Sequence, residues 1–168
     1  YEIPKRDWSS DVCSSDLGSR RLDDAGLTPP GLVLRRARAD ELAECAGLYV
    51  RVLTDTFTWL PPERHRAADF LAAARDEEVF VAVREGRIVG LAALYRPQAF
   101  LHSLYVTERG RGVGRALLQY VAASAGGRLQ LKCQAANVRA QAFYDREGFR
   151  CTERGRDNGV DWLRYVRD

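Results

Sequence analysis

A strand-like segment in the second half of the chain leads into a glycine-rich turn, and a helix-like segment follows that turn. Residues 100–106 (FLHSLYV) have the composition of a strand, the glycines are Gly110, Gly112 and Gly114, and apolar residues recur at helical spacing from Val113 onward. The start of a helix presents backbone N–H groups and the positive end of the helix dipole, and glycines let an anion approach them closely. The segment therefore predicts a site for a pyrophosphate at the turn.

Two common nucleotide-binding motifs do not fit this turn. Arg115 follows Gly112 by three positions and Leu117 follows Gly114 by three, so the glycine pattern of Rossmann folds is absent. The Gly-Lys-Ser/Thr of a Walker motif is missing as well. A plain strand-to-helix connection remains the alternative to a phosphate site.

The rest of the chain alternates between strand and helix patterns. Alternating apolar residues predict strands over residues 32–38, 78–84, 88–95, 100–106 and 128–133, and a last hairpin from residue 149 that turns at residues 157–159. Apolar residues three and four positions apart predict a helix capped by Asp40, a short helix over residues 65–75, the helix after the glycine turn, and a helix over residues 137–147. The order β-α-α-β-β-β-α-β-α-β-β is typical of a single α/β (α+β) domain.

The composition excludes several classes of protein. Hydrophobic residues make up 46% of the 168 residues, which is typical of a folded domain. No apolar run approaches the roughly 18 residues of a membrane span, and no signal peptide is visible, so a cytoplasmic protein is expected. The net charge of +3 is carried by scattered arginines, which predicts no nucleic-acid surface but suits a ligand with several phosphates. Four cysteines without metal-ligand spacing predict no metal site, and three of them, Cys45, Cys133 and Cys151, are expected in the core.

The first seventeen residues have neither helical nor strand periodicity. They resemble the translation of a common sequencing-library adapter, and the chain contains no methionine. We therefore predict that residues 1–17 are an adapter-derived, non-native peptide and exclude them from reasoning about the fold. Residues 18–31 are expected to be a leader or linker, and residues 32–168 the folded domain.

A second motif narrows the identity of the phosphate ligand. The helix predicted over residues 137–147 begins with asparagine and continues into a Phe-Tyr pair and a Gly-Phe pair. Together with the Arg-x-x-Gly-x-Gly turn, this pattern resembles the GNAT superfamily of N-acetyltransferases over residues 32 to about 166. The residues that carry the resemblance are Leu104, Tyr105, Val106, Arg109, Gly112, Gly114, Asn137, Ala140, Phe143, Tyr144, Gly148 and Phe149.

The resemblance implies a fold, a co-substrate and a reaction. The fold would be a mixed, mostly antiparallel sheet with helices on both faces and a splay between strands four and five. Acetyl-CoA would donate its acetyl group to a primary amine by direct attack, without a metal. The link between Val106 and Arg109 is about two residues shorter than in most relatives, so either the turn is tightened or the strand is shortened.

The resemblance also implies roles for individual residues. The strand segment Leu104, Tyr105 and Val106 would offer backbone groups to the pantetheine arm, and Asn137 would bind that arm from the other side. Tyr144 would reach the sulfur and protonate the departing thiolate. Since Asn137 and Tyr144 are seven positions apart, they would lie about 10.5 Å apart along one helix face. The pyrophosphate would be bound by the arginine and the backbone amides of the turn, at Arg109, Arg111, Gly112, Val113, Gly114, Arg115 and Ala116.

The base and the acceptor are less constrained by the sequence. His102 lies on strand four, at the even positions shared with Leu104 and Val106 and beside the splay, and is a candidate base or water-holder; a structural histidine is the alternative. His65 is expected at the surface. Acceptor contacts are expected in residues 54–66, with Asp55, Trp59 and Glu63 as candidates.

Other functions remain open alongside this one. A small-molecule or peptide amine would be the partner, and the protein would be a monomer or a homodimer. The alternatives are a non-catalytic acyl-CoA sensor of the same fold and an interaction module in which the glycines only form a turn.

Overall fold

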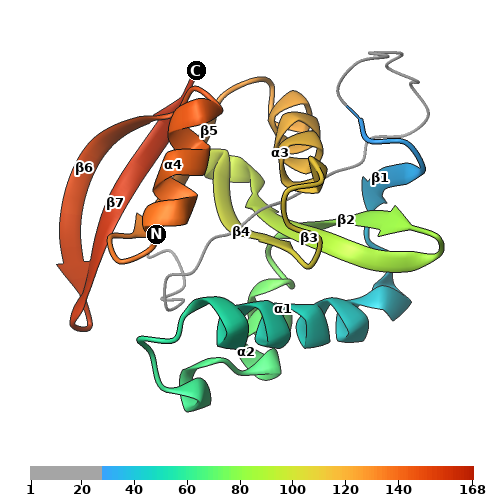
Figure 1. Ribbon diagram of the computed structural model, residues 1–168, viewed down its shortest axis with the longest axis horizontal. Coiled ribbons are helices and arrows are strands. Elements are labelled where there is room, and N and C mark those ends of the chain that lie inside the picture. Colours follow the sequence, from blue (N-terminus) through green and yellow to red (C-terminus); the bar gives the residue numbers. More distant parts are fainter. Residues whose placement is uncertain (1–27) are drawn as a thin grey trace.

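One mixed sheet forms the centre of the molecule in the computed structural model, which describes residues 28–168 (Figure 1). The predicted adapter peptide and part of the predicted leader lie outside these residues. The predicted order of strands and helices is confirmed. The elements are β1 (Leu32–Arg36), α1 (Leu42–Thr56), α2 (Ala67–Ala73), β2 (Glu78–Arg84), β3 (Arg87–Tyr95), β4 (Phe100–Val106), α3 (Val113–Ser124), β5 (Leu129–Gln134), α4 (Val138–Arg146), β6 (Arg150–Asp157) and β7 (Val160–Arg167).

The sheet is mostly antiparallel, as expected. Within the described residues its strand order is β1-β2-β3-β4-β5-β7-β6, and each neighbouring pair is antiparallel except β4 and β5. The last hairpin turns at Asn158 and Gly159, which both have a positive φ. The second strand of this hairpin, β7, pairs with β5, and β6 is the edge strand.

The contact between β4 and β5 is short. These parallel strands are paired only at Phe100 with Gln130 and at Leu101 with Leu131. Both strands continue beyond these positions, to Val106 and Gln134 respectively, but there they pair only with their other neighbours, β3 and β7. The expected splay between strands four and five is therefore present, and it opens toward the C-terminal ends of both strands.

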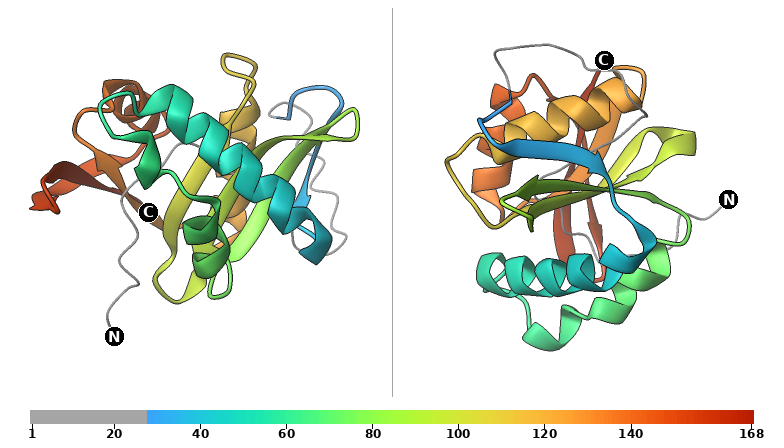
Figure 2. Two further views of the ribbon diagram at one scale, coloured as in Figure 1. Left: turned by 90° about the horizontal axis from the view of Figure 1, so that it is seen from below. Right: turned by 90° about the vertical axis from the view of Figure 1, so that its right-hand side faces the viewer.

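Helices cover both faces of the sheet. Figure 2 (right) places α3 on one face, and α1 with α2 on the other. Each layer has its own core, and burying one large apolar side chain in it contributes about 1.5–3 kcal/mol. The α3 side includes Phe80, Leu94, Leu104, Leu117, Leu131 and Tyr144, and the α1 side includes Tyr49, Leu53, Phe70, Val81, Leu91 and Tyr105.

The start of α1 differs from the prediction. Asp40 does not cap the helix, because residues Ala39–Glu41 form a 3₁₀ turn and α1 begins at Leu42. No side chain caps α1 itself; the carboxylate of Glu41 instead closes the 3₁₀ turn, where its Oε2 accepts a hydrogen bond from the backbone N–H of Arg38 (2.8 Å). The two acids are adjacent in the sequence, and the ion pair of Glu41 with Arg35 favours the second one (2.6 Å).

Two predictions of burial were wrong. His65 is buried beside Phe57, with ring centroids 6.3 Å apart, because the segment after α1 folds back onto the core. Cys151 is exposed, since it lies on the edge strand β6 that no helix covers on its outer side. Cys45 and Cys133 are buried in the core as predicted.

Candidate active site

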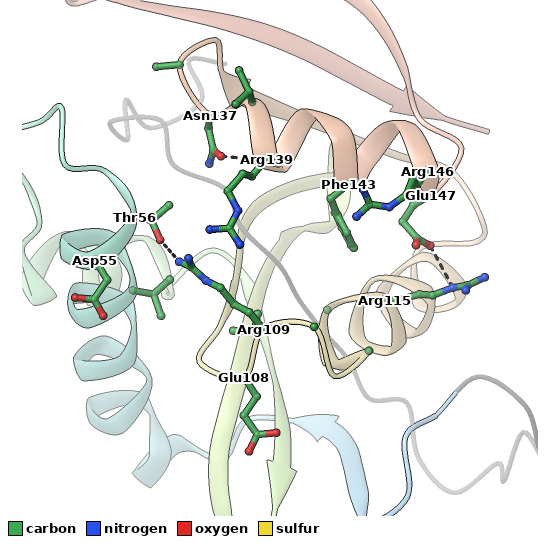
Figure 3. A pocket seen from close by; sticks show the side chains of 18 of the residues that line it. Asp55, Thr56, Glu108, Arg109, Arg115, Asn137, Arg139, Phe143, Arg146 and Glu147 are labelled. Carbon is green, nitrogen blue, oxygen red and sulfur yellow. Dashed lines mark hydrogen bonds and ion pairs between the residues drawn. The ribbon is translucent and has the colours of Figure 1, made fainter.

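A cleft of about 680 Å³ lies where β4 and β5 have separated. It is bordered by the end of β4 at Val106, the glycine-rich turn, the exposed side of α4 and the C-terminal end of α1 (Figure 3). Of the predicted cofactor-binding residues, it brings together Val106, Arg109, Gly112, Gly114, Arg115 and Asn137.

The glycine-rich turn is tightened, and the strand before it keeps its length. β4 runs to Val106, and Thr107 still donates its N–H to the carbonyl oxygen of Val89 on β3 (2.9 Å). The chain then reverses through Gly110 and Gly112, each with a φ of 73°, a conformation that side chains with a Cβ rarely adopt. The short link predicted from the sequence is thus accommodated within residues 107–112.

Gly112 is the N-cap of α3, so the first N–H groups of the helix point out of its end at the cleft. The amide of Ala116 is different, because it donates to the carbonyl oxygen of Gly112 (3.0 Å) as the first bond within the helix. The side chain of Val113 is buried beneath α3, which leaves only its backbone as a contact for a ligand. Ala116 therefore drops out of the set of amides that can meet a phosphate.

Ion pairs and hydrogen bonds anchor the turn on both sides. The carboxylate of Glu108 forms an ion pair with Arg84 at the end of β2. The guanidinium of Arg109 donates a hydrogen bond to Oγ1 of Thr56, the last residue of α1 (2.6 Å). The turn is thereby tied to the sheet and to the helix on the opposite wall of the cleft.

The two predicted residues of α4 lie differently. Asn137 is the N-cap of α4, with its Oδ1 accepting a hydrogen bond from the amide of Ala140 (3.1 Å), and it also lines the cleft. Tyr144 is fully buried, and its ring packs against Phe149 and Tyr165 at centroid distances of 5.5 and 5.9 Å. Burial raises the pKa of Tyr165 to about 12. Tyr144 lies on the inner side of α4, and its neighbour Phe143 lines the cleft.

The predicted residues of β4 face different layers. Leu104 and Tyr105 are fully buried, in the cores of the α3 side and the α1 side respectively. His102 is the extra residue of a bulge, since Leu101 pairs with Leu94 and Ser103 with Ala93. The bulge interrupts the alternation, so the expected common face of His102 with Leu104 and Val106 is not formed. The Nδ1 atom of His102 lies 2.5 Å from the Oε1 atom of Glu77, and His102 does not line the cleft.

Two of the three acceptor candidates border the cleft. Asp55 and Trp59 line its α1 wall, whereas Glu63 does not. The indole N–H of Trp59 donates a hydrogen bond to Oε1 of Gln134 at the end of β5 (2.8 Å), which bridges the gap between the α1 wall and the second half of the sheet.

Several residues of the cleft were not individually predicted as site residues. Arg139 and Arg146 of α4 line it, as does Phe143, which was named only as part of the family motif. Thr56 of α1 also lines it and lies within residues 54–66, where acceptor contacts were expected. A signal for the α4 residues was present in the sequence, because positions 139, 143 and 146 lie four and three apart and so share one helix face. Nothing in the local sequence placed Thr56 opposite the turn.

Two further features of the described residues bear on the class of protein. Within residues 28–168, no group of histidine, cysteine or acidic side chains is arranged to hold a metal ion. Over the same residues, no helix is long and apolar enough to cross a membrane.

Solved structures with the same fold come from several organisms. The GCN5-related N-acetyltransferase from Rhodopseudomonas palustris is 22% identical, with a TM-score of 0.68 over 83% of this chain and 96% of that one. Apo YjaB from Escherichia coli is 27% identical, with a TM-score of 0.67 over 80% and 96%. YncA from Salmonella typhimurium, described as a putative acetyltransferase and solved with acetyl-CoA, is 20% identical, with a TM-score of 0.60 over 81% and 92%.

The sequence itself identifies the family. No curated protein sequence matches the chain. The family model "Acetyltransferase (GNAT) family" matches residues 42–149, a segment that runs from the start of α1 to the end of the glycine-phenylalanine pair after α4. The chain therefore belongs to the GNAT family of acetyltransferases.

Proposed function

We propose that this protein transfers the acetyl group of acetyl-CoA to a primary amine by direct attack of the amine on the thioester. The observation that carries the proposal is the cleft between the separated ends of β4 and β5, which the N-terminus of α3 borders. A cleft open to one side suits an extended ligand with an anionic group at its mouth and a reactive group inside.

The charges of the cleft support coenzyme A as the ligand. Arg109, Arg115, Arg139 and Arg146 border it, together with the N-terminus of α3, which attracts anions. The amides of Val113, Gly114 and Arg115 are proposed to meet the pyrophosphate. Asn137, at the end of the gap between the strands, is proposed to bind the pantetheine arm.

The chemistry requires that the amine loses a proton. An amine with a pKa near 10.4 is more than three pH units from being neutral at pH 7, which costs about 4.6 kcal/mol at 1.36 kcal/mol per unit. A base or a chain of waters must therefore accept the proton, and an acid should meet the departing thiolate. Tyr144 is the proposed acid, because it lies on α4 directly beside Phe143, which lines the cleft.

His102 remains the candidate base or water-holder, with Glu77 as its partner; because it does not line the cleft, it would act through water. The bulge places His102 one residue beyond Leu101, the last position of β4 that pairs with β5. It therefore lies at the point where the two strands begin to separate. The carboxylate of Glu77, 2.5 Å away, can hold the imidazole in one tautomer.

The α1 wall is proposed to receive the acceptor. Asp55 offers a carboxylate to a charged amine, and Trp59 offers an aromatic wall that its hydrogen bond to Gln134 fixes in place. These residues leave the acceptor's identity open among small-molecule and peptide amines.

One experiment separates this function from a sensor of the same fold. The melting temperature is measured with and without acetyl-CoA, and thiol release from acetyl-CoA is then followed over a panel of primary amines. Both a rise in melting temperature and amine-dependent thiol release are expected. Binding without thiol release with any amine would favour the acyl-CoA sensor, and absence of binding would contradict the proposal.

A further inference from the structure

Two arginines of α4 reach into the cleft without an acidic partner. Arg139 and Arg146 both line the cleft, and they are seven positions apart, which is about 10.5 Å along one side of the helix. Among residues 28–168, neither guanidinium forms a hydrogen bond or an ion pair with a carboxylate. Arg115 differs, because it lies 3.6 Å from Glu147.

The acidic residues of the cleft do not balance these two charges. Glu108 is paired with Arg84, and Glu147 is shared between Arg115 and the side-chain amide of Gln119 (3.2 Å). The remaining acid of the lining, Asp55, belongs to α1 on the opposite wall. The α4 wall thus carries positive charge that no acidic residue lining the cleft neutralises.

The two arginines lie on different sides of the α3 N-terminus. In Figure 3, Arg139 extends toward Arg109 near Asn137, whereas Arg146 lies beside Phe143, on the side of Arg115. A pyrophosphate at the start of α3 would lie between them. If pantetheine leaves the pyrophosphate past Asn137, the adenosine half of coenzyme A must leave on the other side, toward Phe143 and Arg146.

The adenosine half of coenzyme A carries a third phosphate, a monoester at the 3′ position of the ribose. Arginine is well suited to a phosphate monoester because its planar guanidinium can donate two parallel hydrogen bonds. We propose that Arg146 binds this 3′-phosphate and makes the enzyme selective for coenzyme A over its 3′-dephospho form. Arg139 instead contacts the pyrophosphate side, which both forms share. The proposal rests on the proposed function, since it assumes that the cleft binds coenzyme A.

The test compares affinities for coenzyme A and 3′-dephospho-coenzyme A by calorimetry on the full chain at one ionic strength. The wild type should bind coenzyme A roughly tenfold more tightly, the low end for hydrogen bonds between charged groups. Arg146→Gln should bind coenzyme A as weakly as the dephospho form, while its affinity for the dephospho form stays unchanged. Arg139→Gln should weaken the binding of both ligands by the same factor. Arg150→Gln is the matched control, because Arg150 is exposed, pairs with Asp168 (2.8 Å) and lies outside the cleft.

The possible outcomes distinguish a failure of this inference from a failure of the proposed function. Equal affinity of the wild type for both ligands would overturn the 3′-phosphate subsite and leave the proposed function intact. If Arg146→Gln still binds coenzyme A more tightly than the dephospho form, the inference is also overturned. If only Arg139→Gln loses this preference, Arg139 and not Arg146 binds the 3′-phosphate, and the inference is wrong. If neither ligand binds to the wild type, the proposed function fails. Melting temperatures of the variants equal to that of the wild type exclude unfolding as the cause.

Discussion

Tyr144 is buried between α4 and the sheet, in contact with the rings of Phe149 and Tyr165. Tyr144→Phe removes one oxygen and little volume, so it tests the hydroxyl alone. If the hydroxyl protonates the thiolate, kcat should fall by about 10²-fold, the lower end for general acid catalysis, while the Kd for acetyl-CoA stays similar. A variant with lowered stability but unchanged turnover per folded molecule would show that Tyr144 only packs the core.

His102 can act as a base only in its neutral form. The wild type should then show an acidic limb in the pH profile of kcat/KM that is separate from the limb at about pH 10 that the amine itself produces. His102→Gln keeps a polar group beside Glu77, and it should lower the rate and remove the lower limb. An acidic limb that is the same in the variant and the wild type would assign His102 to structure and leave the proton to water.

Glu41 contributes to stability in a pH-dependent way. Hydrogen bonds from the guanidinium of Arg35 lower the pKa of Glu41 to about 2. A carboxyl group whose pKa is lower in the folded state stabilises the fold above its unfolded pKa of about 4.3, and this contribution disappears as the pH falls toward 2. Glu41→Gln should therefore be less stable than the wild type at pH 7 in chemical denaturation, and the difference should shrink below pH 4. A difference that stays constant with pH would mean that packing, not charge, accounts for it.

Individual residues mark the limit of prediction from sequence. The burial of His65 depends on how the segment after α1 folds back, and the bulge at His102 depends on the pairing of β4 with β3. Neither has a local signal, because a bulge residue looks like any other position in an alternating strand. Asn137 was predictable as an N-cap, since that role follows from its place before a helical pattern.

At the scale of elements, the turn before α3 is the part of the site most open to a direct test. Gly114→Glu places a carboxylate beside the first amides of α3, where a pyrophosphate is expected, and should reduce the affinity for acetyl-CoA below detection in calorimetry. Gly47→Glu is the matched control, because Gly47 is also a helical glycine, lies on the exposed side of α1 outside the cleft, and a Cβ there meets no neighbour within 4 Å. Affinity retained in a folded Gly114→Glu protein would place the phosphates elsewhere.

The elements themselves were largely predictable. Apolar residues at every second position identified the strands, and apolar residues three and four positions apart identified the helices, because most of these elements bury one face or both in a core. The mostly exposed strand β6 was identified as the first half of the last hairpin. The interactions that anchor the glycine-rich turn to the sheet and to α1 were not predictable. The ion pair of Glu108 with Arg84 and the hydrogen bond of Arg109 to Thr56 join residues that are far apart in sequence and become neighbours only when the sheet forms.

At the scale of the whole molecule, the cleft lies between two parts of the fold, and a ligand in it should stabilise both. At a concentration of 100 times its Kd, acetyl-CoA should add about 2.7 kcal/mol to the free energy of unfolding. For a domain of this size that corresponds to a rise in melting temperature of about 5–10 °C, measurable by differential scanning fluorimetry. No rise at saturating acetyl-CoA would contradict binding to the folded state.

The two-pair contact between β4 and β5 gives the molecule a seam. On one side of it lie β1 to β4 and on the other lie β5, β7 and β6, so the hydrogen bonds of the central sheet join these halves at one end only. The two halves are joined near Leu101 and Leu131, and the cleft lies at the opposite end, where β4 and β5 are separated. A co-substrate bound between the separated ends of β4 and β5 would hold the two halves together during each catalytic cycle. The departure of coenzyme A would then remove this bridge, so the release of product and the stability of the seam would be linked.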